Sequence, residues 1–263
     1  MRTTRAWRFF RAAWPPLLFG VAFLVLWEAA VNVFDWKPYF LPKPSRIWDA
    51  FTDNLTSIRE AAAVSGGNAL IGLLFGTLLG VAMSFLLMRF RLLNDMVTPL
   101  AVGLNAIPIF VLVSVFNNMF STTSEIPRRL MVTLVVYFIV LINVAKGLRQ
   151  VEGTHLELMR SYAATPRQVL LKTRIPNAVP YLFTALKIAA PNAVIVAFVA
   201  EYFGGSQNGL GSRITSNMTA NTAAAWAYVL GACLLGLAFY LISILLESLI
   251  TRQWGASPGG GAT

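Results

Sequence analysis

Side chains able to do covalent chemistry are scarce in this sequence. Its 263 residues include one histidine, His155, one cysteine, Cys233, and only 11 Asp and Glu. A single His and a single Cys exclude a Cys/His metal cluster, a disulfide within the chain and a Cys–His catalytic pair. No G-x4-G-K-[ST] phosphate-binding loop occurs, so we do not expect this chain to bind a cofactor or to hydrolyse ATP itself. Cys233 lies in an apolar run and is expected to be a small core residue.

Four ionisable residues stand inside strongly apolar runs, where a charge is costly and marks a function or a specific partner. Glu28 is expected either to line a passage or to hold helices together. Glu201 lies near the end of its run, so it either faces solvent or forms a gate or a partner contact. Glu247 is expected to pair with Arg252, and Lys187 to extend its ammonium group to the membrane surface.

Further polar or helix-breaking residues in these runs could line a passage or form ordinary hydrogen bonds between helices. Pro191 removes the helical bond that would end on the Lys187 carbonyl, which predicts a kink in its helix. Pro108 would free a carbonyl in the same way. The candidates for lining a passage are therefore Glu28, Asn105, Pro108, Asn143, Pro191, Asn192 and Glu201.

A polar, basic segment, residues 148–180, interrupts the apolar runs of the second half, and we call it the elbow. Thr154 and Glu157 have the spacing of a capping box, and Thr165 with Gln168 repeats it, followed by a proline at the first helical position. This spacing predicts two short helices, about 155–163 and 166–174, the second ended by Pro176. Two capped, basic helices between membrane spans indicate a docking element. Its basic residues would pair with acids of a partner or follow the charge bias of membrane topology.

Composition predicts an integral, all-α membrane protein. The chain is 57% hydrophobic and 12% charged, against about 25% charged residues in soluble domains. A helix needs roughly 20 mostly apolar residues to cross a bilayer. Six runs satisfy this, which predicts six transmembrane helices in one domain, 15–250, after a basic segment 1–14 and before a disordered tail, 251–263. The six runs are 15–34, 66–88, 96–117, 129–147, 181–203 and 226–250.

The basic residues predict the orientation of these helices. Fourteen of the 21 Lys and Arg fall on one side if the Arg-rich N-terminus is cytoplasmic, which is the bias that membrane proteins show. Both termini and the elbow are then cytoplasmic. The net charge of +10 is explained by this bias, so nucleic acid is not expected as a partner.

Two local patterns complete the prediction. Ser45 can cap a short amphipathic helix whose Ile47, Trp48 and Phe51 suit the membrane interface. The second run carries glycines at 72, 76 and 80, a flat stripe along which another helix can approach closely. We expect this stripe to pack within the subunit rather than between subunits.

The elbow resembles the cytoplasmic loop of the membrane subunits of ATP-binding-cassette (ABC) importers, patterned E-A-A-x3-G-x9-I-x-L-P. Glu157 holds the Glu, Ala163 replaces the Gly, and Pro176 holds the Pro. Leu158 and Met159 replace the two Ala, while Thr173 and Ile175 stand for the Ile and Leu. By this resemblance the ATPase-docking residues are Glu157, Leu158, Met159, Arg160, Tyr162, Ala163, Arg167, Lys172, Arg174 and Pro176.

Other segments resemble the nitrate/sulfonate/taurine branch of these permeases. They are Leu41-Pro42-x-Pro44 after the first run, residues 143–148, and an acid, Glu201, followed by Gly209-Leu210-Gly211. Residues 117–139 depart from the family pattern. The resemblance covers about 38–250.

The resemblance implies a type I ABC importer permease fold with cytoplasmic coupling helices, in the plasma (inner) membrane. It implies a homodimer, two copies of a separate ATPase that holds ATP and Mg, and an extracytoplasmic substrate-binding protein. The cargo would be a small solute: nitrate, an alkanesulfonate such as taurine, or a pyrimidine-type vitamin precursor.

Two other classes of function agree less well with the sequence. A secondary transporter or channel, without an ATPase partner, would show inverted repeats or unwound half-helices around paired charges, and neither is visible. A membrane enzyme would need a clustered nucleophile, base or metal set. The single histidine of the chain lies in the elbow, which argues against a membrane enzyme.

Overall fold

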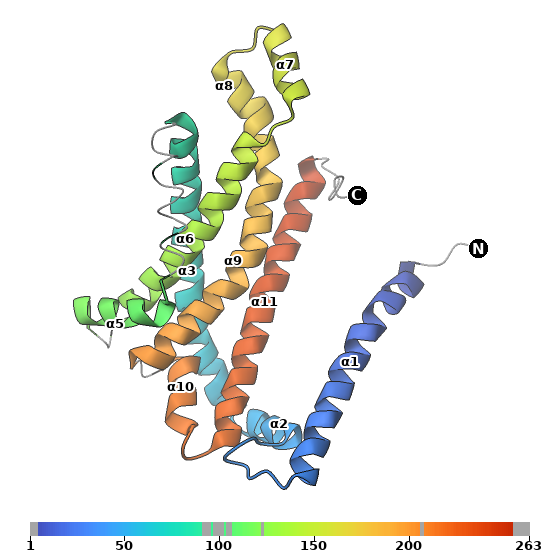
Figure 1. The fold of residues 1–263 in the computed structure, drawn as a ribbon, viewed down its shortest axis with the longest axis vertical. Coiled ribbons are helices and arrows are strands. Elements are labelled where there is room, and N and C mark those ends of the chain that lie inside the picture. The colour runs from blue at the N-terminus through green and yellow to red at the C-terminus, as the bar shows by residue number, and fades with distance from the viewer. Residues whose placement is uncertain are drawn as a thin grey trace.

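The computed structural model describes residues 5–90, 96, 103, 107–121, 124–205 and 208–254, with side chains between 14 and 250. Within these residues every regular element is a helix (Figure 1). In chain order the helices are α1 Arg5–Val33, α2 Pro44–Asp53, α3 Leu55–Arg89, α5 Ile109–Met119, α6 Ile126–Arg149, α7 Gly153–Ser161, α8 Pro166–Val169, the π-helix η1 Leu170–Arg174, α9 Ile175–Gly204, α10 Leu210–Asn217 and α11 Thr222–Trp254.

Five of the described helices are long and apolar enough to cross a membrane. They correspond to the first, second, fourth, fifth and sixth predicted runs, so the membrane class is confirmed for this part of the chain. The third predicted run, 96–117, lies largely outside the described residues, and α5 is its described part. Asn105 and residues 255–263 of the predicted tail also lie outside them. The prediction of disorder is wrong for residues 251–254, because α11 continues to Trp254.

The glycine stripe of α3 packs against α6, as expected for a contact within the subunit. A Cβ added at Gly76 would lie 2.7 Å from the Thr133 carbonyl oxygen and 2.7 Å from the Val136 Cβ. Gly72 and Gly80 meet Val132 and the Tyr137 carbonyl in the same way. Only glycine permits two helix backbones to approach this closely. The α3–α6–α9 contact forms the main core, built from small and branched residues of α6 and α9.

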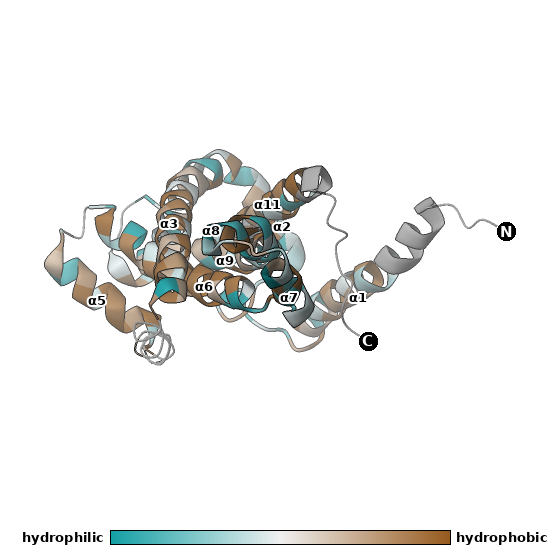
Figure 2. Ribbon diagram, turned by 90° about the horizontal axis from the view of Figure 1, so that it is seen from above, coloured by the Kyte–Doolittle hydropathy of each residue, from teal (hydrophilic) through white to brown (hydrophobic). Residues whose placement is uncertain are grey.

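The first span joins the bundle mainly through α2. Figure 2, seen from the α7–α8 end, shows α1 apart from the group formed by α3, α6, α9 and α11. The Glu28 carboxylate accepts hydrogen bonds from the Ser45 amide (3.1 Å) and the Ser45 hydroxyl (2.7 Å). The prediction that Ser45 caps α2 is therefore wrong. Pro44, with its fixed φ, already occupies the first helical turn, so Ser45 lies inside the helix and Glu28 supplies the acceptor.

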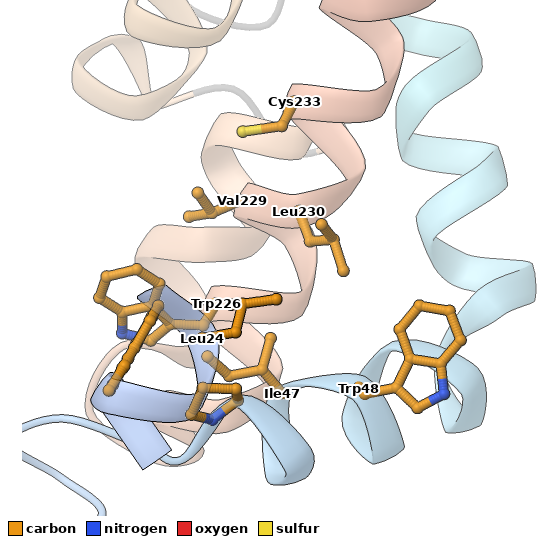
Figure 3. Close-up of a pocket in the computed structure, with 9 residues that line it drawn as sticks. Leu24, Ile47, Trp48, Trp226, Val229, Leu230 and Cys233 are labelled. Carbon is orange, nitrogen blue, oxygen red and sulfur yellow. The ribbon is translucent and has the colours of Figure 1, made fainter. Parts of the chain in front are cut away.

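An apolar groove of about 470 Å³ lies between α1, α2 and α11. Figure 3 shows Leu24 and Trp226 on one side of it and Trp48 on the opposite side. Cys233 is exposed and lines this groove, so its predicted place in the core is wrong. The reason is that Cys233 lies on a face of α11 between two grooves, this one and another between α9 and α11.

Candidate coupling elbow and the helix that leads from it

The first elbow helix, α7, begins two residues earlier than its sequence signal indicates. Glu152 is the N-cap, and its carbonyl accepts hydrogen bonds from the amides of His155 (3.1 Å) and Leu156 (3.3 Å). Thr154 therefore lies inside the first turn, and no side chain caps α7. The predicted Thr154–Glu157 capping box is wrong because Gly153 already adopts the helical conformation.

The turn after α7 keeps the geometry that the family pattern assigns to a glycine. Ala163 has φ +48°, a left-handed conformation that favours glycine. Its amide donates to the Arg160 carbonyl (2.9 Å), and the Ala164 amide donates to the Met159 carbonyl (2.9 Å). These two bonds are those of a Schellman motif. Ala163 therefore holds the left-handed turn despite its methyl group.

Replacing Ala163 with glycine should stabilise this turn. The methyl group costs about 1 kcal/mol in the left-handed region, so Ala163→Gly should slow amide hydrogen exchange at residues 163 and 164 about fivefold. Ala164→Gly, at a residue without positive φ, should give no protection. Faster exchange in Ala163→Gly than in the wild type would contradict the assignment.

The second elbow helix is continuous with the span that follows it. The predicted Thr165–Gln168 capping box is present: the Gln168 amide donates to Thr165 Oγ1, and the Thr165 amide donates to Gln168 Oε1 (2.7 Å). From Pro166 the chain stays helical through α8, η1 and α9 to Gly204.

The prediction that Pro176 ends this helix is wrong. In the π-helical turn η1, the Ile175 amide bonds to the Leu170 carbonyl five residues back. The wider turn shifts the hydrogen-bond register just before Pro176, so the proline stands at the junction of η1 and α9 without ending the helix.

The base of the elbow is fixed to the end of α6 by residues that sequence reasoning did not single out. The Asn177 amide group donates to the carbonyls of Gly147 (2.7 Å) and Gln150 (3.0 Å). The Arg174 guanidinium donates to the Leu148 carbonyl (3.2 Å). Free carbonyls at the end of α6 therefore receive donors, which stiffens the joint. Arg174, predicted to dock a partner, is half-buried and faces α6.

Most of the predicted docking residues lie exposed on the elbow. Glu157, Arg160, Ala163, Arg167 and Lys172 are exposed, together with two large apolar side chains, Leu158 (52% exposed) and Tyr162 (76% exposed). Leu171 adds a third at 63%. Met159 and Pro176 are half-buried. Exposed apolar groups rimmed by charges are typical of a protein interaction site.

The predicted passage residues do not gather in one place. Asn143 and Asn192 are half-buried, and each donates to the carbonyl four residues earlier in its own helix. Glu28 holds α2. Pro108 is not inside a helix: it is the exposed N-cap of α5. Pro191 lines an apolar groove of about 550 Å³ between α9 and α11. Figure 1 shows α9 changing direction along its length, in agreement with the predicted kink.

Lys187 and Glu247 pair with each other across α9 and α11. Lys187 Nζ lies 2.8 Å from Glu247 Oε2, and both side chains are largely buried. The prediction that Lys187 extends to the surface is therefore wrong. The pairing of Glu247 with Arg252 stays a prediction, because the Arg252 side chain lies outside the described ones. The physical reason is that helix packing brings the opposite charge within reach inside the bundle, which lowers the cost of burying each one.

Glu201, at the far end of α9, is completely buried. Its Oε2 accepts hydrogen bonds from Ser65 Oγ of α3 (2.7 Å) and from the Gly211 amide of α10 (3.2 Å). Ser65 Oγ in turn accepts the Leu210 amide (2.9 Å). We call Glu201, Ser65 and the first turn of α10 the clasp. The expectation that Glu201 faces solvent is wrong because α10 folds back over it.

The glycines of the G-L-G segment make the clasp possible. A Cβ at Gly209 would lie 2.2 Å from the Glu201 carboxyl carbon, and one at Gly211 would lie 2.3 Å from the Phe198 carbonyl oxygen. Only residues without a side chain fit between α10 and α9 there. Glu201 Oε1 has no hydrogen-bond partner among the described residues.

A second polar cluster lies beside the clasp and also escaped sequence reasoning. Glu125 Oε2 accepts from Asn68 Nδ2 (2.6 Å) and pairs with Arg128 Nη1 (3.1 Å), whose side chain is buried. Arg129 Nε donates to Asn68 Oδ1 (3.0 Å). Asn68 follows Ser65 by three residues on α3, so both polar groups share one helix face. The three-residue spacing of Ser65 and Asn68 was the sequence signal that could have predicted this polar cluster.

Five long apolar helices around a close-packed core, with a polar elbow at one end, define a multi-span membrane protein. Residues 72–254 match the family described as "Binding-protein-dependent transport system inner membrane component", and the chain belongs to this family. This confirms the predicted class, an ABC importer permease in the inner membrane.

Individual relatives agree with this assignment. The chain is 30% identical over 204 residues to the formylaminopyrimidine transport permease protein ThiX of Halalkalibacterium halodurans, covering 74% of this chain and 78% of ThiX. It is 27% identical over 261 residues to the riboflavin transport system permease protein RibX of Chloroflexus aurantiacus, covering 94% and 93%.

A solved structure has a similar fold. A chain of the MetNI methionine ABC transporter in an inward-facing conformation matches with a TM-score of 0.60 at 17% identity, covering 73% of this chain and 97% of that chain. This likeness confirms the predicted permease fold.

Proposed function

We propose that this permease couples to a separate ATPase through the elbow and takes its cargo from an extracytoplasmic binding protein. The observation that carries the proposal is the continuous helix from Pro166 to Gly204. Because one continuous, though bent, helix joins the elbow to the far end of the bundle, a displacement at the elbow should be passed on to the span. A flexible loop would instead absorb the displacement.

The elbow offers the surface that such an ATPase would grip. Exposed Leu158, Tyr162 and Leu171 provide apolar contact, and Arg160, Arg167 and Lys172 provide charge. In the proposed mechanism, ATP and Mg bind between two ATPase copies and close them, the elbow transmits the closure, and the passage opens outward. Hydrolysis then resets it. The passage forms between two copies of this chain, with both termini and the elbow cytoplasmic.

The first cargo to test is a pyrimidine-type vitamin precursor, with nitrate and alkanesulfonates as the competing candidates. The support for this choice is the 30% identity to a formylaminopyrimidine permease over three-quarters of the chain. Uptake of each labelled solute by the reconstituted complex separates them, because only the true cargo should show ATP-dependent accumulation.

Glu157→Lys should release the ATPase. Glu157 is exposed on α7, so the change alters the docking surface without disturbing the core. Reversal of a charge at an interface should lower ATPase co-purification from membranes at least about tenfold, and ATP-driven uptake should fall with it. Glu60→Lys, the same charge reversal at an exposed residue of α3 outside the elbow, is the matched control and should keep both co-purification and uptake. Intact assembly and uptake in Glu157→Lys would refute the docking role.

A further inference from the structure

A basic pocket lies where the elbow meets the end of α3. It has a volume of about 710 Å³ and is lined by four arginines, which come from α3, α7, α8 and η1. No acidic side chain of the described residues lines it. The lining residues are Met88, Arg89, Arg160, Ala164, Pro166, Arg167, Val169, Leu170 and Arg174.

Three of these arginines are available to a ligand, while the fourth, Arg174, donates to the Leu148 carbonyl. Arg89, Arg160 and Arg167 are exposed, and none of them pairs with an acid of the described residues. The Arg89 guanidinium lies over the Phe90 ring, 5.4 Å from its centre, which orients it without using its N–H groups. Planar guanidinium groups bind phosphate oxygens through paired hydrogen bonds. Several of them around one cavity therefore favour a phosphate group.

The other part of the lining is apolar and adjoins a row of exposed apolar side chains on α3. Met88, Val169 and Leu170 lie among the arginines. Phe75 (58% exposed), Leu79 (53%) and Leu86 (41%) follow one face of α3 at spacings of four and seven residues. Arg89 is three residues further along the same face. An exposed apolar track that ends at a cluster of arginines matches an acyl chain joined to an anionic headgroup.

We propose that this pocket binds the phosphate headgroup of an anionic phospholipid of the cytoplasmic leaflet. The position of the pocket at the cytoplasmic leaflet rests on the proposed function, in which the elbow is cytoplasmic. Basic pockets between helices on the cytoplasmic side are suited to anionic headgroups. The bound lipid would contact both α3 and the elbow helices α7 and α8. It would therefore tie the moving elbow to a fixed span.

The test uses the complex of this chain with its ATPase in nanodiscs of phosphatidylcholine, with and without phosphatidylglycerol. Native mass spectrometry then counts the lipids that stay bound. We expect the wild type to retain phosphatidylglycerol selectively. Arg89→Gln should lower this selectivity about fivefold, since one basic residue near the surface contributes about that factor. Arg89→Glu should lower it further. Lys146→Gln, which removes an exposed charge from the end of α6 outside the pocket, should leave it unchanged.

Three results would overturn the proposal. ATPase co-purification, measured in the same samples, separates lipid binding by the pocket from docking of the ATPase. The first is equal retention of both lipids by the wild type, or undiminished selectivity in Arg89→Glu. The second is displacement of the lipid by millimolar inorganic phosphate, which would assign the pocket to a free anion. The third is loss of the ATPase in Arg89→Glu with lipid selectivity intact, which would assign the pocket to the protein interface.

Discussion

Replacing Glu201 with alanine is expected to detach the first turn of α10 from α3 and α9. The change leaves the Ser65 hydroxyl and the Gly211 amide without their buried acceptor, and it opens a void in a fully buried site. Together these losses should cost about 3 kcal/mol. Amide hydrogen exchange at Leu210 and Gly211 should then become about a hundredfold faster, which exchange mass spectrometry can measure.

Two further variants separate the clasp from a general loss of stability. Glu201→Gln keeps an acceptor oxygen of the same reach, so it should lie between the wild type and Glu201→Ala. Glu60→Ala removes an exposed carboxylate of α3 and should change stability by no more than about 0.5 kcal/mol. Unaltered exchange at residues 210 and 211 in Glu201→Ala would show that the clasp does not hold α10.

The clasp also predicts a functional effect, because Glu201 belongs to the same helical rod as the elbow. In Glu201→Ala the ATPase should still co-purify, since the elbow is unchanged, while uptake of the cargo should fall. A mutant that loses both together would indicate misfolding rather than broken transmission.

Leucine at Gly76 should prevent α3 from packing against α6. The side chain would start 2.7 Å from the Thr133 carbonyl oxygen, and a backbone atom cannot move aside as a flexible side chain could. Overpacking of this kind costs about 3 kcal/mol. We expect a lower unfolding temperature of the detergent-purified protein and a lower yield from membranes.

The matched control for this variant is Gly67→Leu, in the same helix. No atom lies within 4 Å of a Cβ built at Gly67, and leucine has a higher helix propensity than glycine. This variant should be as stable as the wild type or more stable. Equal destabilisation by the two changes would mean that helix packing along the stripe is not the cause.

Several features of the molecule could be predicted from the sequence because they depend on local chemistry or on composition. The apolar runs fix the number of residues available to cross a bilayer, and the described spans lie within or around five of them. The Thr165–Gln168 capping box, the amphipathic α2 and the glycine stripe each depend on residues a few positions apart. The membrane class and the family follow from the same patterns.

Tertiary structure alone decided the partners of the charged and polar residues. Glu201 meets Ser65 136 positions away, and Lys187 meets Glu247 60 positions away. No periodicity encodes such a pair, because each side chain bonds whichever group helix packing brings within about 3 Å. The misassigned caps have a local reason instead. Thr154 and Ser45 carry the right chemistry, but Gly153 and Pro44 start their helices earlier. The π-helical turn before Pro176 also made the helix continuous where the sequence predicted its end. A proline lacks one backbone hydrogen bond, and a local change in the helical pitch can remove the need for that bond.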